Sequence, residues 1–389
     1  MDIISEIREL LPSHPELQLD WTRIEHSSIG GFLKEMQKTP QNPDFHGEGD
    51  VYIHTKMVCQ ELTKNSEFYR CLPWQQIGLF LAALLHDLGK TRTTRMEDGK
   101  WTPPHHSATG SLMVREFLWK TCGLCGTSEK QRIRELVCSL VRHHMLAVHM
   151  LEKQNPDYKL RKTASVGEMA ADFSWHLLCL LSEADVKGRI APDIGESLEK
   201  IDLCRVMAQE AGCFDAPYLF RDRYTKRAYF SGRNVMPDQV LYNDTWGEVI
   251  LLSGLPGTGK DTYIQEHLSG LPVISLDEIR KECKIKPTDR QDIVIQTAKE
   301  RAKEYLRRKQ PFVWNATNIT QDIRQKQISL FERYGASVRI IYLETDWKTQ
   351  MERNKGRDAF VPEKVIEKML AKTVPPTPDE AEDVEWHCV

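Results

Sequence analysis

Three glycines and a lysine stand close together near residue 255, in a spacing that suits phosphate binding. The apolar run Val249 to Leu252 leads into Ser-Gly-Leu-Pro-Gly-Thr-Gly-Lys-Asp-Thr, which ends at residue 262. Glycine permits positive φ angles and a close backbone approach, and free amides at a helix start attract an anion. The residues expected to hold a polyphosphate are Gly254, Gly257, Thr258, Gly259, Lys260, Asp261 and Thr262.

This spacing, G-x-x-x-x-G-K, matches the P-loop, in which the lysine reaches the β- and γ-phosphates. The hydroxyl residue that normally comes next and helps to hold Mg²⁺ is replaced by Asp261, with Thr262 one position later. We therefore expect ATP or another nucleoside triphosphate to bind here with Mg²⁺, rather than a plain glycine-rich turn between strand and helix. The protein contacts of the metal stay open.

A second group of residues, in the first half of the chain, has the chemistry of a metal site. His86 and Asp87 are neighbours at the end of an apolar helical pattern, and Lys90 lies on the same helical face as His86. An imidazole and a carboxylate placed in this way can bind one metal, and the lysine can meet a substrate phosphate. The other histidines and acids at helical positions are His54, His105-His106, His143-His144 and Asp185.

These residues resemble the HD phosphohydrolase superfamily, whose pattern is a first His, then His-Asp, then a late Asp. His54, His86-Asp87 and Asp185 match it one by one. Members with two metals carry further histidines, which His106 and His144 match, although the neighbouring His105 and His143 remain alternatives. The resemblance implies one or two divalent transition-metal ions, such as Mn²⁺, a metal-activated water, and phosphate-ester hydrolysis with Asp87 and Lys90 in catalytic roles. The alternative is a partly degenerate fold that uses these histidines structurally.

The periodicity of the apolar residues predicts two different folds in the 389-residue chain. Up to residue 215, apolar residues recur at helical spacing and strand-type alternation is almost absent. From residue 247 on, strand-like runs alternate with helical patterns, which is typical of a parallel sheet covered by helices. We therefore predict an all-α HD-type domain at 1–215, a linker at 216–246 and an α/β P-loop kinase domain at 247–389.

Charged residues near the predicted strand ends indicate what a kinase site would contain. Asp277 and Arg280 follow the second strand at a helix start, where a carboxylate can accept a proton and a guanidinium can bind a phosphate. Arg353 and Arg357 share one face of a later helix and suit a lid over the polyphosphate. Asn315 stands where many P-loop kinases have an acid near Mg²⁺. Ordinary N-cap and surface roles are the alternatives for the charged residues.

Between the two predicted domains, basic residues alternate with aromatic ones and helical periodicity fails. The residues are Arg221, Arg223, Lys226, Arg227 and Arg233 with Phe220, Tyr224, Tyr229 and Phe230. This composition suits a surface that binds single-stranded nucleic acid, and a solvated linker whose rings pack on the domains is the alternative.

Composition limits the remaining possibilities. The formal net charge of −3 gives no general case for nucleic-acid binding. The longest apolar run, Leu79 to Leu85, is too short to cross a bilayer, and the N-terminus reads as an acidic amphipathic helix rather than a signal peptide. We therefore expect a cytoplasmic protein without a membrane partner, and we assign no chemistry to the tail from Pro375 to Val389.

The P-loop, the D-x-x-R formed by Asp277 and Arg280, and the paired arginines resemble the polynucleotide kinase branch of P-loop phosphotransferases. An HD domain followed by such a kinase is similar to the HD-Pnk type of bacterial RNA end-healing enzyme. The resemblance implies that Asp277 is the general base for a 5′-hydroxyl, that Arg280 contacts the acceptor phosphate, and that Arg353 and Arg357 hold the donor. It also implies that the HD domain removes 2′,3′-cyclic, 2′- or 3′-phosphates.

The expected partners are RNA ends, with DNA left open, a nucleoside triphosphate donor and an RNA ligase that acts afterwards. Two other functions remain. One is an HD nucleotidase fused to a nucleoside or sugar kinase, and the other is an ATP-gated regulator that binds ligands without turnover.

Overall fold

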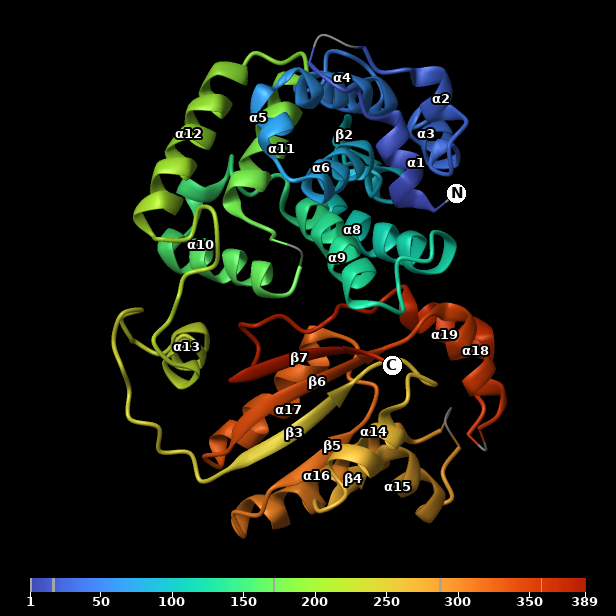
Figure 1. Cartoon of the computed structure of the whole chain (residues 1–389), viewed down its shortest axis with the longest axis vertical. Coiled ribbons are helices and arrows are strands. Elements are labelled where there is room, and N and C mark those ends of the chain that lie inside the picture. Colours follow the sequence, from blue (N-terminus) through green and yellow to red (C-terminus); the bar gives the residue numbers. More distant parts are fainter. Residues whose placement is uncertain (1, 16–17, 171, 287–288, 358) are drawn as a thin grey trace. The chain divides into compact units, whose positions relative to one another are not determined.

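The computed structural model describes residues 2–15, 18–170, 172–286, 289–357 and 359–389, and its residues group into two compact units. The first comprises Met1–Leu124 and Glu129–Tyr218, and the second comprises Cys125–Ser128 and Leu219–Val389. Figure 1 shows helices in the first unit and a sheet with flanking helices in the second. The predicted fold class, a helical domain followed by an α/β domain with a parallel sheet, is confirmed.

Helices build the first unit around one hydrophobic core. They are α1 (Ile3–Leu10), α2 (Trp21–Glu25), α3 (Gly30–Met36), α4 (Val51–Lys64), α5 (Ser66–Arg70), α6 (Pro73–Leu85), α7 (Lys90–Thr93), α8 (His106–Glu116), the π-helical turn η1 (Phe117–Thr121), α9 (Ser128–His143), the 3-10 turn η2 (Met150–Glu152), α10 (Pro156–Ala164), the 3-10 turn η3 (Ser165–Glu168), α11 (Trp175–Lys187) and α12 (Ile194–Glu210).

Helix α6 is the centre of this unit. Every residue from Ile77 to Leu85 is buried, as expected of a helix that is apolar on all sides. Helices α4 and α11 pack against it and against each other. Because α6 ends at Leu85, the polar pair His86-Asp87 directly follows the core helix and is buried with it.

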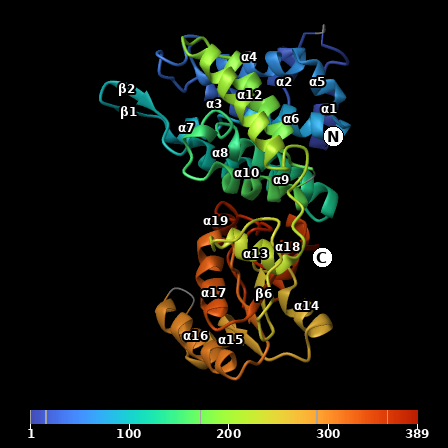
Figure 2. The ribbon, with the colours of Figure 1, turned by 90° about the vertical axis from the view of Figure 1, so that its left-hand side faces the viewer.

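A short hairpin interrupts the helices of the first unit. Strands β1 (Arg95–Glu97) and β2 (Lys100–Thr102) pair antiparallel, and Figure 2 shows them projecting beside α7. Asp98 and Gly99 between them have φ angles of 49° and 77°. An Asp-Gly pair with positive φ at both positions favours a tight hairpin turn. The expectation of helix throughout residues 1–215 is therefore wrong here, and Asp98-Gly99 is the signal that could have predicted the hairpin.

Five parallel strands form the sheet of the second unit, in the order β4-β5-β3-β6-β7. Their bounds are β3 (Glu248–Ser253), β4 (Val273–Ser275), β5 (Phe312–Asn315), β6 (Ser337–Glu344) and β7 (Asp383–Cys388). The helices are α14 (Lys260–His267), α15 (Leu276–Glu282), α16 (Gln291–Arg307), α17 (Gln321–Arg333), α18 (Trp347–Lys355) and α19 (Glu363–Leu370). The central strand β3 is buried from Val249 to Ser253, so the glycine-rich turn follows a strand held on both sides.

Strand β7 lies in the tail to which the sequence assigned no chemistry. It pairs with β6 along its whole length. The segment before it is anchored by Arg324, whose Nε and Nη2 each donate to the carboxylate of buried Glu380 at 2.7 Å. The acidic tail thus completes the sheet.

The predicted linker contains a helix of the second unit, α13 (Arg223–Phe230), which begins at the N-cap Asp222. Arg227 is buried, bonds Asp379 O at 2.9 Å and pairs with Glu332, while the rings of Phe220, Tyr229 and Phe230 pack together. The expectation of an irregular segment is wrong for α13, because Arg227, Tyr229 and Phe230 are buried against packed neighbours. These three of the nine residues proposed for nucleic-acid contact are part of a folded core, whereas Arg221, Arg223 and Arg233 are exposed.

Among the described residues, none of the helices combines the length and the apolar character needed to cross a membrane.

Candidate functional sites

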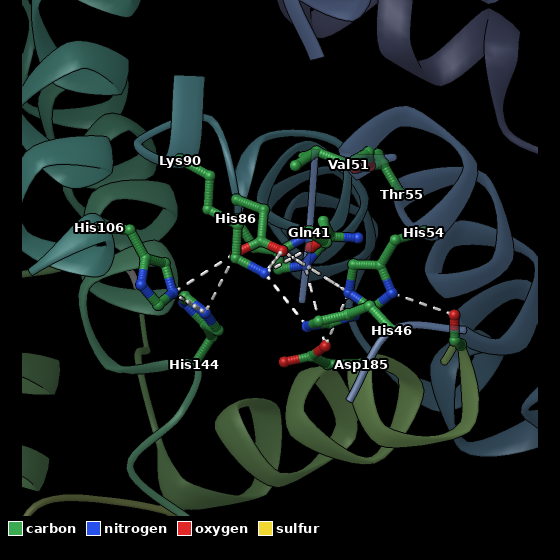
Figure 3. Close-up of polar contacts among 12 residues, drawn as sticks. Gln41, His46, Val51, His54, Thr55, His86, Lys90, His106, His144 and Asp185 are labelled. Carbon is green, nitrogen blue, oxygen red and sulfur yellow. Dashed lines mark hydrogen bonds and ion pairs between the residues drawn. The ribbon is translucent and has the colours of Figure 1, made fainter. Parts of the chain in front are cut away.

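Side chains from five places along the chain meet in the first unit (Figure 3). His54 comes from α4, Asp185 from α11, His106 from the start of α8, and His86-Asp87 from the end of α6. His144 follows the last residue of α9. Apart from His106, which is partly exposed, these side chains are buried.

The carboxylate of Asp87 lies between two groups of nitrogen atoms. Its Oδ2 is 3.3 Å from Nε2 of His86 and 3.6 Å from Nε2 of His54, which in turn lies 3.0 Å from Oδ1 of Asp185. Its Oδ1 is 3.4 Å from Nε2 of His106 and 3.8 Å from Nε2 of His144. One carboxylate thus faces two separate sets of possible metal ligands.

The backbone sets the orientation of all four imidazoles. Nδ1 of each lies within hydrogen-bond reach of a carbonyl oxygen: Gly188 at 3.1 Å for His54, Ala83 at 2.8 Å for His86, Pro103 at 3.1 Å for His106 and Val141 at 2.7 Å for His144. A carbonyl only accepts, so Nδ1 carries a proton and Nε2 is the nitrogen that faces the cluster. This is the usual support of a metal-binding histidine.

The ionisation of these groups suits a metal. Burial raises the pKa of Asp87, but Lys90 and His86 outweigh it and hold the pKa well below its usual range. Burial lowers the pKa of His144 to about 4, so its Nε2 is unprotonated at neutral pH. Burial also opposes protonation of His54, but Asp185 and Glu48 outweigh it and raise its pKa to about 9. A metal bound at this nitrogen displaces that proton.

The donor set fits divalent metal ions. Oδ1 of Asp87 is buried and has no hydrogen-bond partner among the described residues, although an ionised carboxylate oxygen at such a place needs one. Imidazole nitrogens with carboxylate oxygens suit a transition metal. Two close groups contain these atoms, His54-His86-Asp87 and Asp87-His106-His144.

The structure distinguishes the neighbouring histidines that the sequence left open. His105 is exposed, in the left-handed backbone region with a φ of 53°, whereas His106 faces Asp87. The ring of His143 lies against Phe173, away from the cluster, whereas His144 faces inward. Neighbours along a helix point to different sides, which is why one of each pair joins the cluster.

Lys90 and residues that the sequence did not single out surround this cluster. Lys90 Nζ lies 2.7 Å from both Oδ2 of Asp87 and Oε1 of Gln41, and 3.4 Å from Nε2 of His46. Buried Glu48 accepts from Nδ1 of His46 at 2.8 Å and from Nδ1 of His54 at 3.0 Å. The loop that carries His46 and Glu48 therefore helps to orient His54, a candidate metal ligand.

A cavity of about 390 Å³ opens beside Asp87, Lys90 and Asp185. Arg189 also lines it, and its Nε is a buried atom without a hydrogen-bond partner among the described residues. The sequence reasoning missed Arg189, which follows the C-cap Gly188 of α11 and therefore lies close along the chain to Asp185. Nη2 of Arg189 is held by Oδ2 of Asp193 at 3.2 Å and by Oγ of Ser197 at 2.9 Å, which fixes the guanidinium beside the cavity.

In the second unit the glycine-rich turn has the backbone that the sequence predicted. Gly257 and Gly259 have φ angles of 83° and 85°, and a Cβ at Gly254 would lie 2.5 Å from the carbonyl oxygen of Leu343. Lys260 Nζ donates to the carbonyls of Gly254 and Leu255 at 2.9 Å and 2.8 Å. Burial, with the nearby charge of Arg357, lowers the pKa of Lys260 to about 8. Thr258 is buried and bonds within the turn.

The predicted charged residues gather at the same edge of the sheet. Asp277 pairs with Arg280, and its Oδ2 lies 3.7 Å from Nη2 of Arg357. The same guanidinium lies 3.9 Å from Asp261 Oδ2, and Asn315 donates to Asp261 Oδ1 at 2.7 Å. Arg357 thus stands between the residue next to the phosphate loop and the predicted base.

A cavity of about 590 Å³ adjoins the phosphate loop. Gly257, Gly259, Lys260, Asp261, Thr262, Arg353 and Arg357 line it, together with Tyr263, Glu266, His267, His387 and Val389. His387 lies in β7 and Val389 directly follows that strand. The sequence reasoning missed β7 because a short edge strand in an acidic tail has no apolar periodicity. Asp277 and Arg280 are not among the described residues that line the cavity. Asp277 is linked to it by its contact with Arg357, which is a lining residue.

Comparison with known proteins agrees with both sites. Residues 51–167 match the HD domain, and residues 249–376 match an AAA domain. The multifunctional CCA protein of Stenotrophomonas maltophilia (strain R551-3) is 28% identical over 214 residues, 52% of this chain and 48% of that protein. The multifunctional CCA protein of Hahella chejuensis (strain KCTC 2396) is 27% identical over 159 residues, 40% of this chain and 33% of that protein.

The chain thus spans about half, or less, of the length of these curated relatives. The HD match covers the histidines and Asp87 of the cluster but ends before Asp185, and the AAA match covers the phosphate loop. The protein therefore joins an HD phosphohydrolase domain to a P-loop kinase-like domain of the AAA type.

Proposed function

We propose that this protein heals broken RNA ends with both domains. The HD domain removes 2′,3′-cyclic, 2′- or 3′-phosphates, and the P-loop domain phosphorylates 5′-hydroxyl ends with ATP. The proposal is carried by one observation: the same chain holds the Asp87 cluster with Lys90 beside it and a phosphate loop with the Asp277-Arg280 pair at the same edge of the sheet. The likeness to multifunctional CCA proteins supports an RNA substrate.

In the HD domain, His54, His86, Asp87 and Asp185 would hold one metal ion, and Asp87, His106 and His144 a second. Such ions supply a bound water of lowered pKa and a Lewis acid for a phosphoryl oxygen. Lys90 and Arg189, which both line the cavity, offset the charge on the non-bridging oxygens of the phosphate. Glu48 keeps His54 in the tautomer that presents Nε2 to the cluster.

In the P-loop domain, the amides of the glycine-rich turn and Lys260 hold the donor phosphates, with Mg²⁺ beside Asp261. Asp277 takes the proton from the 5′-hydroxyl while the oxygen of that hydroxyl bonds to the γ-phosphorus of ATP. The bond between the γ-phosphorus and the β,γ-bridging oxygen breaks, and ADP is released. Arg280 binds the acceptor phosphate. Arg353 and Arg357 stabilise the charge on the transferred group, and Arg357 is already within 3.7 Å of Asp277.

The test is a mass spectrum of a short RNA with a 5′-hydroxyl and a 2′,3′-cyclic phosphate, incubated with the protein, ATP, Mg²⁺ and Mn²⁺. We expect gain of a 5′-phosphate and loss of the phosphate at the other end. An unchanged RNA, with ATP consumed only when free nucleosides or sugars are added, would instead favour the small-molecule enzyme. Binding of ATP and metal with no product from any substrate would favour the ATP-gated regulator.

Single substitutions separate the two activities. Lys260→Ala or Asp277→Ala should abolish 5′ phosphorylation and leave phosphate removal intact, because neither side chain belongs to the HD unit. Asp87→Ala should have the opposite effect. Phosphate removal that survives Asp87→Ala would contradict the proposed metal centre.

A further inference from the structure

The cavity of the HD domain is lined by more than the charged groups that the hydrolysis uses. Two aromatic side chains, Phe45 and Trp101, line it together with Asp87 and Lys90. Phe45 is 50% exposed. Trp101 is half-buried. Neither ring belongs to the metal cluster or to the phosphate-binding cations.

Both rings lie close in the sequence to residues at or beside the metal cluster. Phe45 directly precedes His46, whose Nε2 lies 3.4 Å from Lys90 Nζ. Trp101 lies in β2, on the segment that runs from α7, which carries Lys90, to His106. An ion pair of 2.9 Å between Asp44 and Lys100, the neighbours of the two rings, joins the two segments. The rings therefore belong to one wall beside the phosphate site.

The distribution of polarity along this cavity resembles that of a nucleotide. The lining includes Arg189 and the buried Asp87 and Lys90, which suit a metal-bound phosphate. It also includes the two more exposed rings, and stacking on rings beside a cationic groove is how proteins bind single-stranded nucleic acid. The volume of about 390 Å³ is in the range of pockets that bind one small ligand.

We propose that Phe45 and Trp101 bind the base of the terminal nucleotide while its phosphate lies at the Asp87 cluster. The inference rests on the proposed function and deepens it, because it restricts the HD substrates to phosphates on a nucleoside. Every base has a flat face, so the contact favours nucleotides over other phosphate esters without selecting one base.

The test compares two RNA oligonucleotides with a 3′-terminal phosphate, which differ only in whether the last ribose carries a base. We expect the wild-type protein to prefer the base-bearing end by at least about tenfold in kcat/KM, the scale of one base–ring stack. Trp101→Ala and Phe45→Ala should lose that preference through a higher KM, with kinetics on the abasic end unchanged. Trp101→Phe should retain most of it.

Met96→Ala is the matched control, because Met96 pairs with Trp101 across the hairpin and lies outside the described lining of the cavity. It should keep the full preference. An equal loss on both oligonucleotides, or a wild-type protein without preference, would overturn the base contact.

Failure of the proposed function has a different result. A wild-type protein inactive on both oligonucleotides, but active on 3′-AMP, would remove the RNA assignment, and the base contact is then decided by comparing 3′-AMP with ribose 3-phosphate. Inactivity on all four substrates would overturn the removal of 3′-phosphates by the HD domain and, with it, the base contact.

Discussion

Asn315 donates a hydrogen bond of 2.7 Å from Nδ2 to Oδ1 of Asp261. The carboxylate thus comes from the start of α14 and its neutral partner from the end of β5, which reverses the order usual in P-loop kinases. Asp261 and Asn315 each depart from the usual P-loop kinase pattern, and the structure shows that they bond to each other. This interaction places the negative charge of Asp261 at the start of α14 beside the phosphate loop, where Mg²⁺ is expected.

The first prediction concerns this pair. Asp261→Ala should raise the Mg²⁺ concentration for half-maximal kinase activity by about tenfold or more, because the carboxylate beside the metal is lost. Initial rates over a Mg²⁺ titration at saturating ATP measure this change.

Asn315→Asp supplies the control. It places two carboxylates within hydrogen-bond distance, which raises the pKa of one of them and should lower activity. The double change Asp261→Ser with Asn315→Asp should recover activity relative to Asn315→Asp alone. An unchanged Mg²⁺ requirement in Asp261→Ala would remove Asp261 from the metal site.

The second prediction concerns the number of metal ions in the HD domain. His106→Ala should lower the bound Mn²⁺ from two ions to one, because His106 belongs only to the group around Oδ1 of Asp87. Metal analysis after dialysis measures the content. His105→Ala, at the exposed neighbour, should bind as much metal as the wild type. One ion in the wild type would argue against a second site, and two ions in His106→Ala would remove His106 from it.

The third prediction concerns Gly89, which lets α7 and α8 approach closely. A Cβ there would lie 2.0 Å from the carbonyl oxygen of His106 and 2.6 Å from the nitrogen of Gly110. Gly89→Ala should therefore move His106 away from Asp87, weaken metal binding and cost about 1–3 kcal/mol of stability, as overpacking usually does. Thermal unfolding with and without Mn²⁺ measures both effects.

Gly31→Ala is the control for this substitution. A Cβ at Gly31 meets no atom within 4 Å, so this variant should bind metal like the wild type. Normal metal binding by Gly89→Ala would mean that the α8 start can shift without moving His106 Nε2.

The fourth prediction concerns acid stability. Buried Glu135 pairs with Arg115 and with Arg134, each at 2.8 Å. Burial raises its pKa, but the two guanidinium groups outweigh it and hold the pKa below the ordinary 4.5. A carboxyl whose pKa is lower in the folded state than in the unfolded state stabilises the fold at any pH above its pKa in the unfolded state. This stabilisation is lost as the pH falls below about 4.5.

Glu135→Gln should therefore destabilise the helical unit at pH 7 by about 3–5 kcal/mol, because two buried cations lose their counter-charge. The difference from the wild type should shrink toward pH 3. Urea unfolding at several pH values measures it, with exposed Glu129→Gln as the control. A deficit independent of pH would mean that packing rather than charge is responsible.

Local sequence patterns determined the main elements of this protein. The apolar run of α6, and the strand followed by glycines and a lysine, involve neighbours along the chain, whose spacing alone decides helix, strand and turn. The same holds for the ligand types, since His86-Asp87 and Lys90 lie within one turn and a half of each other. The HD and P-loop assignments, and the fold class, needed nothing more.

Only the tertiary structure decided which side chains meet. His106 rather than His105 faces Asp87, Asn315 bonds Asp261, and Phe45 shares a cavity with Trp101, because each contact joins segments far apart in sequence. Strand β7 and helix α13 depend in the same way on partners elsewhere, namely β6 and Glu332. A polar or charged segment shows no periodicity of its own, so its structure is set by the surface on which it packs.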